Sequence, residues 1–398
     1  MNKAKLGNFI DVIRGKSLPG INYSEQGTLI RLTLGNFYEQ GGFKYNTSKK
    51  DIYYIGKVSP EYILKKGDII TPLTEQSRGL LGATARIPES GKYIHSQDIG
   101  LVKCKSGKMH PSFCYYLLSS LMVRKQLSAG AQQTKIRHTS PDKIKDVAVI
   151  VPEYDTQLKI GELLDTITNK IELNSRINLN LKKLAKALYD YWFVQFDFPD
   201  ENKRPYKSSG GKMVYNEVLK REIPIGWEVK PLGDICDLYQ SETISEKDCI
   251  EDGKYYVYGS NGIIGKYNEK NHNESEIVIS CRGNCGNVIR TMPNVWITGN
   301  AMVIHPKEEI GKEFIYFMLK NAGIKRIITG SVQGQITRRN LAPVEIMLPP
   351  KHLLEMYEKQ IRSNVKTRIQ NCQESDCLIN LRNFLLPMLM NGQITINS

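Results

Sequence analysis

The sequence predicts a mixed α/β fold of the α+β type, in which two tandem globular domains alternate with two long helices. Two observations predict this plan. Apolar residues recur at seven-residue spacing in the middle and in the last part of the chain, and the two halves repeat the same motifs in the same order. At 398 residues the chain is long enough to give each domain a core of its own.

The first globular domain is expected over residues 1–152. Short β-type runs such as Thr28–Leu34 are separated by Gly and Pro, and a helix is expected to begin at Phe113. This segment carries 23 Lys and Arg against 11 Asp and Glu, a net charge of +12. Such a charge implies a polyanionic partner, with nucleic acid as the first candidate and an acidic protein as the second.

A long helix is predicted over residues 153–198, because an apolar stripe at helical spacing runs through them. Asn174 falls at the same heptad position as Ile167 and Leu181, where a polar side chain costs stability but fixes the register of a partner helix. The stripe and the seam beside it consist of Ile160, Ile167, Leu181 and Leu188, with Leu164, Ile171, Ile177, Leu184 and Tyr191.

Residues 199–223 are polar and rich in turn-forming residues, which predicts a linker. The second globular domain is expected over residues 224–350. Residues 231–350 carry 13 basic and 14 acidic side chains, so their net charge is −1. If this domain also binds nucleic acid, it must do so through a local basic patch.

A second long helix is predicted over residues 351–398, where the apolar repeat shifts phase once and is interrupted by Asn364, Arg368 and Asp376. Each long segment could span about 50 Å at ~1.5 Å per residue, so the two helices can pair as a coiled coil. The apolar positions are Leu354, Ile361, Val365, Cys372, Ile379 and Leu386.

The two halves of the chain are a diverged repeat. Matching motifs follow one another in the same order, and their offset drifts slowly from 226 to 197 residues. The matches pair Leu6-Gly7 with Leu232-Gly233, Gly82–Arg86 with Gly286–Arg290, Phe113–Leu118 with Phe314–Leu319, Gln133-x-x-Ile136 with Gln333-x-x-Ile336, and Val151-Pro152 with Leu348-Pro349.

Membrane proteins and secreted proteins are not expected, because the chain has no run of eighteen apolar residues and its N-terminus has no apolar signal core. A cytoplasmic protein is expected, and its eight cysteines should be thiols. Cys281 with Cys285, and Cys372 with Cys377, lack the two-residue spacing and the His partners of a zinc site, so no metal ligands are predicted.

No catalytic residues are predicted. Gly15-Lys16-Ser17 lacks the Gly that a nucleotide-binding loop has five residues earlier, and the Asn/Asp-Pro-Pro-Tyr/Phe motif of adenine methyltransferases is absent from the sequence. A nuclease-like combination of Asp200 with Glu228 and Lys230 straddles the expected linker and is attributed to chance. These features favour a binding protein.

The candidate DNA contacts are basic, amide and aromatic residues that gather in Gly-rich turns. Arg can bind guanine edges with two hydrogen bonds and Asn or Gln can do so with adenine, whereas Lys mostly contacts phosphate. A solvated surface charge remains the alternative for each single residue. The candidates are Arg31, Lys44, Arg78, Arg86, Gln133, Lys135 and Arg137 in the first domain, and Tyr258, Ser260, Asn261, Lys266, Arg282, Asn284, Gln333, Arg338 and Arg339 in the second.

Over nearly its whole length the sequence resembles the specificity subunit of type I restriction–modification systems. One departure is that the helix after Pro350 lacks the Gln that the first helix keeps as Gln157. The resemblance rests on Ile223–Ile235 (IPIGWEVKPLGDI), Tyr258–Gly265 (YGSNGIIG), Gln333-x-x-Ile336 followed by Leu348-Pro349-Pro350, and the central run Asn174–Phe193.

The resemblance implies two target-recognition domains in inverted orientation, separated by two antiparallel helices. Each domain would read one half of a split site in double-stranded DNA, and the helices would set the gap. Two modification subunits carrying S-adenosylmethionine would dock around the helices, and restriction subunits would add ATP- and magnesium-dependent translocation and cleavage. This chain itself would bind no cofactor.

The long helices are also expected to carry the interface for the modification subunits. The alternative is that the same side chains only pack the two helices together. The residues concerned are Leu163, Ile171, Tyr189, Trp192 and Phe193, with their C-terminal counterparts.

Two other functions are compatible with parts of the sequence. A single-chain nuclease or methyltransferase is disfavoured by the missing motifs. An interaction scaffold that never contacts DNA would explain the neutral second domain but not the charge of the first.

Overall fold

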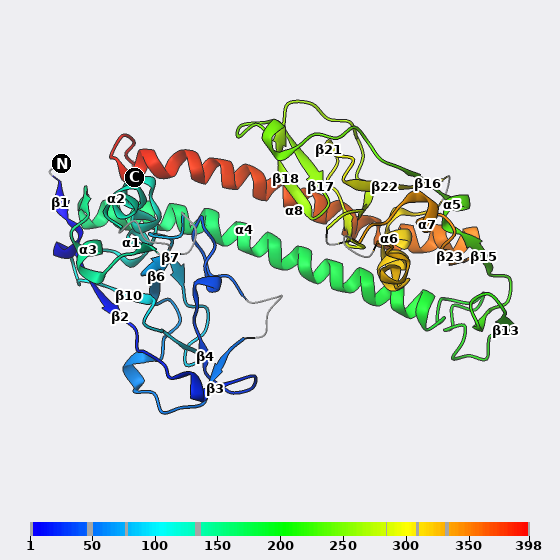
Figure 1. The fold of residues 1–398 in the computed structure, drawn as a ribbon, viewed down its shortest axis with the longest axis horizontal. Coiled ribbons are helices and arrows are strands. Elements are labelled where there is room, and N and C mark those ends of the chain that lie inside the picture. Colours follow the sequence, from blue (N-terminus) through cyan, green and yellow to red (C-terminus); the bar gives the residue numbers. More distant parts are fainter. Residues whose placement is uncertain are drawn as a thin grey trace. The chain divides into compact units, whose positions relative to one another are not determined.

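The computed structural model describes residues 3–45, 51–75, 79–131, 137–283, 285–307, 310–330 and 334–396. The chain divides into two compact units: unit 1 contains Met1–Leu173 and Glu374–Ser398, and unit 2 contains Asn174–Gln373. Each unit combines a globular domain of mixed helices and strands with part of both long helices (Figure 1). The predicted α+β class is therefore confirmed.

Unit 1 is built around a four-stranded antiparallel sheet in the order β2–β10–β6–β8 (Figure 1). These strands are Ile10–Arg14, Ile99–Cys104, Ile69–Pro72 and Ala85–Arg86. A smaller sheet has the order β3–β5–β4–β9, and its strands are Tyr23–Ser24, Tyr53–Tyr54, Ile30–Arg31 and Tyr93–Ile94. Beside them, β1 (Ala4–Lys5) pairs with β12 (Ala148–Val149), and β7 (Thr74–Glu75) pairs with β11 (Arg137–His138).

Three α-helices and several short 3-10 turns complete the described globular part of unit 1. The α-helices are α1 (Pro111–Ser119), α2 (Leu121–Gly130) and α3 (Pro141–Lys145). Helix α1 is apolar on every face because it is enclosed, and all its residues from Phe113 to Leu118 are buried. Its side chains share one core with Ile160 and Leu164 of the first long helix. The enclosed helix thus joins the sheet to the long helix.

Unit 2 repeats this plan. Its main sheet has the order β16–β22–β19–β20, again antiparallel throughout, so the first, last, second and third strands in sequence lie side by side as they do in unit 1. These strands are Cys236–Tyr239, Ala301–Pro306, Ile277–Ser280 and Val288–Arg290. The pair β15 (Glu228–Pro231) and β23 (Glu345–Leu348) corresponds to β1 and β12. The internal repeat is therefore a repeat of topology.

Unit 2 also contains a three-stranded sheet in the order β18–β17–β21 and three short α-helices among its described residues. The strands are Gly262–Tyr267, Tyr255–Gly259 and Trp296–Ile297, and the helices are α5 (Leu232–Ile235), α6 (Lys312–Asn321) and α7 (Arg338–Leu341). Helix α6 is enclosed like α1 in unit 1, with Phe314–Leu319 buried.

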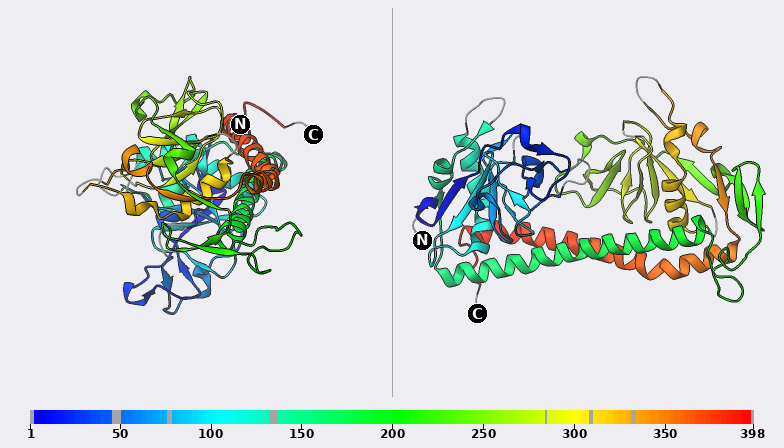
Figure 2. Two further views of the ribbon diagram at one scale, coloured as in Figure 1. Left: turned by 90° about the vertical axis from the view of Figure 1, so that its right-hand side faces the viewer. Right: turned by 90° about the horizontal axis from the view of Figure 1, so that it is seen from below.

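The two long helices are α4 (Tyr154–Tyr189), which continues as a π-helical turn over Asp190–Val194, and α8 (Lys351–Met390). Within unit 2 they lie side by side and run antiparallel (Figure 2), since the contacts between them pair rising residue numbers on one with falling numbers on the other. Side-chain amides donate across the pair from Asn174 to Asn371 O (3.4 Å), from Asn178 to Arg368 O (3.1 Å) and from Asn364 to Leu181 O (2.8 Å).

Asn174 thus contacts a partner helix, as its heptad position predicted, and the contacts of Asn364 and Arg368 explain two of the interruptions in the second apolar repeat. Asn364 bonds to the facing backbone, while Arg368 pairs with a carboxylate described below. In unit 1 the two helices are linked by the Lys170–Glu374 ion pair at 3.2 Å.

The predicted apolar seam of α4 is only partly a packing surface. Leu164 is buried, but the C-terminal part of the seam is exposed: Leu184 is 63 % accessible, and Ile177 and Tyr191 are also exposed. The buried face of this half of α4 runs instead through Asn174, Ala185 and Tyr189. A heptad pattern identifies the helix, but it cannot tell which of two adjacent seams has a partner.

The segment predicted as a linker, 199–223, is instead a folded part of unit 2. The ring of Tyr206 stacks on Phe198 with centroids 4.6 Å apart, and a hairpin forms from β13 (Met213–Asn216) and β14 (Arg221–Pro224). Met213 and Leu219 pack against the core of the unit. Its few apolar residues suffice to fasten a segment whose overall composition is that of a loop.

Candidate nucleic-acid interface

The turn between β17 and β18 presents polar side chains on a rigid base. Tyr258, a predicted DNA contact, is buried with 5 % of its surface accessible, and its hydroxyl accepts a hydrogen bond from Met292 N at 3.2 Å. Ser260 donates to Asn300 O at 2.8 Å. Tyr258 and Ser260 therefore hold the turn, while Asn261 at its tip is exposed and available to a ligand.

The glycine that follows Asn261 allows this turn, because Gly262 has a φ of +114°. Further along β18, the Lys266 ammonium lies 5.5 Å from the centre of the Tyr256 ring. Lys266 pairs with Tyr256 toward the end of the hairpin that lies away from the turn, and the contact with the ring leaves the positive charge of Lys266 unneutralised. Asn261 and Lys266 are thus the predicted residues of this hairpin that can reach a ligand.

Three exposed arginines of unit 2 come from two neighbouring segments. Arg282 lies in a β-bridge with Gln335, and Ile336 N donates to Cys281 O at 3.0 Å, which ties the segments together. Arg338 and Arg339 follow in the first turn of α7 and are exposed.

The start of α7 is fixed by Thr337. Its backbone N–H donates to Asn340 Oδ1 at 2.7 Å, and Asn340 N donates back to the Thr337 hydroxyl at 3.4 Å, a reciprocal N-terminal cap. The Asn340 amide also donates to Ile327 O at 2.8 Å. The two arginines are therefore carried by a fixed backbone, which suits them to bind phosphate or base edges.

In unit 1, two predicted contacts lie next to exposed aromatic rings. The Arg31 guanidinium lies 5.1 Å from the centre of the Tyr23 ring, and the Lys44 ammonium lies 5.7 Å from that of Tyr38. Both rings are at the surface. Cations paired with exposed aromatic rings are suitable contacts for a nucleic-acid backbone and its bases.

Two other predicted contacts of unit 1 are engaged within the protein. Arg86 forms an ion pair with Asp165 of α4 at 2.7 Å. Arg137 pairs with the buried Glu75 at 2.8 Å and also donates to Ser128 O. Moving either guanidinium to DNA would leave a partly or fully buried carboxylate unpaired, so the structure gives both arginines a structural role.

Five predicted contacts lie outside the residues that the structure describes, namely Arg78, Gln133, Lys135, Asn284 and Gln333.

For the three candidate partner-interface residues at the end of α4, the structure favours the alternative, packing within the chain. Tyr189, Trp192 and Phe193 are buried in the core of unit 2, where the Phe193 ring packs against Tyr357 and Phe314 at centroid distances of 5.0 and 4.9 Å. They fasten α4 to its own unit and have no surface left for another protein. Leu163 is exposed and Ile171 is half-buried, so these two remain available.

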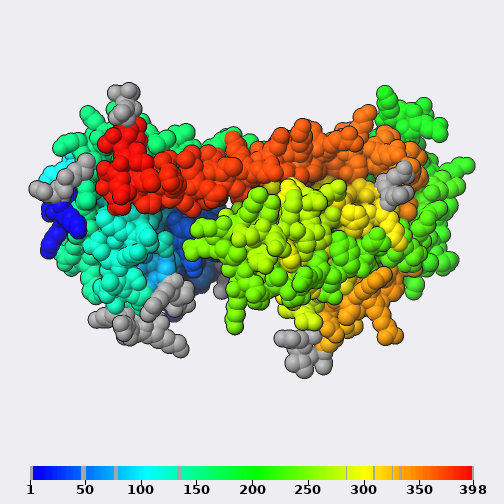
Figure 3. Space-filling view, turned by 90° about the horizontal axis from the view of Figure 1, so that it is seen from above, coloured from blue at the N-terminus to red at the C-terminus, as the bar shows by residue number. Residues whose placement is uncertain are grey.

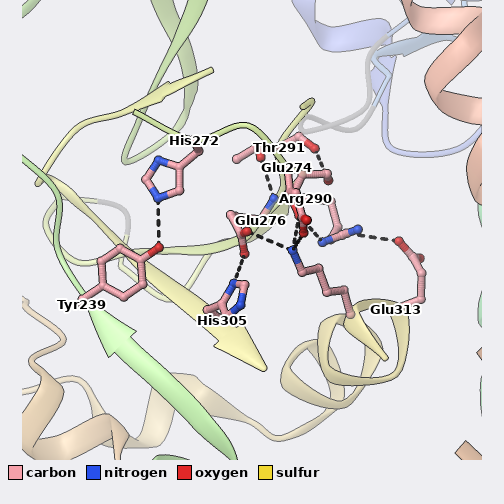
Figure 4. Close-up of polar contacts among 10 residues, drawn as sticks. Tyr239, His272, Glu274, Glu276, Arg290, Thr291, His305 and Glu313 are labelled. Carbon is pink, nitrogen blue, oxygen red and sulfur yellow. Dashed lines mark hydrogen bonds and ion pairs between the residues drawn. The ribbon is translucent and has the colours of Figure 1, made fainter. Parts of the chain in front are cut away.

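Sequence reasoning missed a buried polar network in unit 2 (Figure 4). Lys312 of α6 donates to Glu276 at 2.9 Å, and the same carboxylate contacts His305 Nδ1 at 3.0 Å through its other oxygen. Arg290 pairs with Glu313 at 3.2 Å. Glu276 and Glu313 are almost completely buried, so each needs its cation. The repeat match between Arg86 and Arg290 was the available signal, since both arginines contact a carboxylate.

Glu358 of α8 takes the place of the glutamine that the second helix lacks. Its Oε1 accepts a hydrogen bond from Phe314 N at the start of α6 (3.3 Å), as Gln157 Oε1 accepts one from His110 N at the start of α1 (2.8 Å). Burial raises the pKa of Glu358 to about 7, and the negative charge of Glu313 adds to this rise.

Within the described ranges, no group of three or more His, Cys, Asp or Glu side chains could hold a metal ion, and no helix is long and apolar enough to cross a membrane. The Cys285 thiol donates instead to Gly334 O at 2.8 Å, and burial raises the pKa of Cys281 to about 11. These thiols pack the loops that carry the arginines.

Comparison with known proteins identifies relatives of both units. The family described as "Type I restriction modification DNA specificity domain" matches residues 1–183 and 224–363. The HindI specificity subunit of Haemophilus influenzae is 23 % identical over 83 % of this chain and 87 % of that protein. The MjaIX specificity subunit of Methanocaldococcus jannaschii is 24 % identical over 71 % of this chain and 69 % of that protein.

Among solved structures, the S subunit of the type I restriction–modification system from M. genitalium has a similar fold. The TM-score is 0.61 at 16 % identity, and the match covers 98 % of this chain and 96 % of that one.

Proposed function

This chain belongs to the type I restriction–modification DNA specificity family, and from that premise we propose that each of its two units reads one half of a split DNA site. Its role is DNA recognition as a specificity subunit, whose relatives are named as subunits of type I restriction enzymes. The main observation that supports one half-site for each unit is their common strand order, which is β2–β10–β6–β8 in unit 1 and β16–β22–β19–β20 in unit 2.

The contacts we propose for unit 2 are Asn261, Lys266, Arg282, Arg338 and Arg339, and those for unit 1 are Arg31 and Lys44. Asn261 lies at the tip of the turn that Ser260 and Gly262 fix. The others combine a side chain that is exposed or half-buried with a backbone held by hydrogen bonds, strand pairing or a helical turn. A half-site of a few base pairs gives modest discrimination, and two half-sites on one chain multiply it.

We propose that the paired helices α4 and α8 set the gap between the half-sites. The backbone carbonyls that accept from Asn178 and Asn364 would fix the register of the pair in unit 2, because sliding the helices would break these partly buried hydrogen bonds. Seven residues added to each helix lengthen it by about 10 Å, which corresponds to roughly three base pairs of DNA.

For the modification subunit we propose a docking surface on the exposed seam of α4, formed in unit 2 by Ile177, Leu184 and Tyr191. These residues are spaced seven apart, and all three are exposed. A heptad of apolar side chains without a covering helix is the surface that a helix of a partner would occupy. The outward face of α8 is uncovered as well (Figure 3), and Met356 on it is exposed.

The test is to express the chain with its modification subunit and to detect modified adenine across a genome. One motif of two short half-sites with a fixed gap is expected, and inserting seven residues in both helices should widen the gap by about three base pairs without changing the half-sites. An assembled pair that modifies no motif, together with a chain that shows no salt-sensitive DNA binding, would favour a scaffold instead.

Arg338→Ala with Arg339→Ala sharpens this test. We expect one half-site to lose its specificity or its occupancy while the other is still required, with a cost of about 1–3 kcal/mol for each arginine that contacts a base. Lys247→Ala, at an exposed lysine of the same unit, is the matched control and should leave both half-sites intact.

A further inference from the structure

We propose that Arg86 and Arg290, which occupy the same position of the internal repeat, are positioning residues that hold each globular domain at one angle on the long helices. By doing so they would restrict the gap between the two half-sites to a single length. This inference rests on the proposed function and deepens it, because it names the side chains that make the helix pair an accurate spacer.

In unit 1, three elements meet at one carboxylate. Arg86 at the end of β8 contacts Asp165 Oδ1 of α4 at 2.7 Å, and the Tyr116 hydroxyl of α1 donates to the same oxygen at 2.8 Å. The Arg86 guanidinium also lies 4.4 Å from the centre of the Tyr115 ring. The hydroxyl of Tyr116 further reaches Thr168 Oγ1 of α4 at 3.0 Å. The sheet edge is thereby tied to the long helix by directional contacts.

In unit 2, the corresponding arginine reaches a long helix through one intermediate. Arg290 at the end of β20 contacts Glu313 Oε1 of α6 at 3.2 Å (Figure 4), and Glu313 Oε2 contacts Arg368 of α8 at 3.3 Å. Arg290 also donates to Ser275 O at 3.2 Å. The side chain of Glu313 is 3 % accessible and those of its two arginines 11 and 18 %, so the triad is shielded from solvent.

We call these two sets of contacts the arginine clamps: Arg86 with Asp165 in unit 1, and Arg290, Glu313 and Arg368 in unit 2. Both clamps lie far from the point where the chain passes between domain and long helix, which we call the joint. In unit 1 the chain passes from β12 to α4 at residues 150–153, and Asp165 is eleven residues along α4, about 16 Å from Tyr154. In unit 2 the joint lies between β23 and α8, and Arg368 is seventeen residues along α8, about 25 Å from Lys351. The apolar contact between helix and domain reaches Leu164 in unit 1 and Val365 in unit 2, so each set of ionic contacts lies at the far end of that contact. Directional contacts at this end would limit rocking of the domain about the joint.

Ionic contacts suit this role better than apolar packing. A buried ion pair contributes little more to stability than well-packed apolar side chains do, but its hydrogen bonds are satisfied in only one arrangement. The accuracy required is set by DNA, in which adding one base pair moves the next half-site by about 3.4 Å and turns it by roughly 35°. A domain that rocks through part of that angle accepts neighbouring gaps.

The experiment uses the full chain with its modification subunit and compares modified adenine across a genome for three proteins. These are the native chain, the double variant Arg86→Met/Asp165→Leu, and the triple variant Arg290→Met/Glu313→Leu/Arg368→Met. Because apolar replacements leave no unpaired buried charge, both variants should fold. We expect the share of modification at gaps one base pair shorter or longer to rise roughly tenfold, with both half-site sequences unchanged.

Two further variants keep the test decisive. Arg86→Lys retains the charge but not the planar donor geometry, and should broaden the gap in the same direction by less. Lys103→Met breaks an ion pair of similar length, 2.9 Å to Asp68, that lies within unit 1 and does not involve α4 or α8. It should leave the gap at its native length.

Clamp variants that reduce modification at all sites while keeping a single gap would overturn the inference and leave the arginines a role in stability alone. Failure of the proposed function looks different. In that case the native chain itself would direct modification to an undivided motif, or to none.

Discussion

The two units share a strand order but differ in charge and in how they are fastened to the long helices. Residues 1–152 carry a net charge of +12, whereas residues 231–350 carry −1. Unit 2 is fastened to the end of α4 by the aromatic side chains of Tyr189, Trp192 and Phe193, and unit 1 is fastened to the end of α8 by Leu389 and Met390.

Structural features that both units share are candidates for what the common architecture requires, whereas features that differ between the units are free to vary. The sheet order, the enclosed helix and the arginine clamp occur in both units, so they are what a domain needs in order to sit on the helix pair. Surface charge and the chemistry of the fastening differ between the units. Two domains built in this way can therefore bind different half-sites from the same frame.

The largest expected effect comes from the two fastenings. Phe193→Ala should destabilise unit 2 by about 3–5 kcal/mol, and Leu389→Ala should destabilise unit 1 by about 2–5 kcal/mol, because each removes a buried side chain from a core. Hydrogen exchange should locate each loss in its own unit. Leu184→Ala, on the exposed side of α4, is the control and should change stability by less than about 0.5 kcal/mol. Equal loss of protection in both units would mean that they unfold together.

A smaller effect on the free energy of unfolding is expected from Gln157 and Glu358, which accept hydrogen bonds at the starts of α1 and α6. The pKa of Glu358 is about 7 in the folded chain and 4.5 without its surroundings, so between these values the folded chain holds more protons than the unfolded one. The stability of unit 2 should therefore fall as pH rises from about 4.5 to 7. Glu358→Gln should remove this dependence and stabilise the chain at pH 8 by roughly 1–3 kcal/mol.

The opposite substitution, Gln157→Glu, tests the corresponding position in unit 1. Gln157 donates to Lys108 O and Pro152 O, which a carboxylate cannot do, so Gln157→Glu should destabilise unit 1 at pH 8 by about 1–3 kcal/mol. Thermal unfolding followed from pH 5 to 8 measures both variants. A flat profile for the native chain would contradict the assignment to Glu358.

The smallest expected effect is on the salt dependence of DNA binding, which should follow the charge difference between the two units. Lys44→Ala in unit 1 should weaken DNA binding almost equally for all sequences and reduce the slope of log affinity against log salt by about 1, as expected for one lost phosphate contact. Lys247→Ala in unit 2 should leave the slope unchanged. Titrations at several salt concentrations measure both, and equal slopes for the two variants would show that the field of unit 1 is not used.

The long helices and the repeated domains could largely be predicted from sequence, because heptad spacing and repeated motifs are regular sequence patterns. The start of α4 at Tyr154 and of α8 at Lys351 agree within one residue with the predicted starts of the long helices. Asn174 was expected to face a partner helix from its heptad position alone, and it does contact α8. Two matched motifs of the repeat lie on corresponding elements: Gly82–Arg86 and Gly286–Arg290 reach β8 and β20, and Phe113–Leu118 and Phe314–Leu319 lie in α1 and α6. The match of Gln133 with Gln333 lies outside the described residues.

The features that could not be predicted depend on tertiary contacts without a sequence period. The segment 199–223 is held on unit 2 by Tyr206, which stacks on Phe198, and by Met213 and Leu219, which pack against the core, and no local pattern indicates these contacts. Arg86 and Arg137 are residues of the type that contacts DNA, but each faces a carboxylate, half-buried in Asp165 and buried in Glu75. Glu358 was not recognised as the counterpart of Gln157, because their positions relative to the preceding proline differ.

The division of the chain also determines the order in which its parts can fold during synthesis. Unit 2 is a continuous segment and has all its contacts once residue 373 has emerged, whereas the core of unit 1 includes Leu389 and Met390. At about 5–20 residues per second, the N-terminal domain waits on the order of ten seconds or more after its own last residue before the ribosome supplies these side chains. The second half of the protein is thus expected to mature first, and the first half is the one that would need a chaperone.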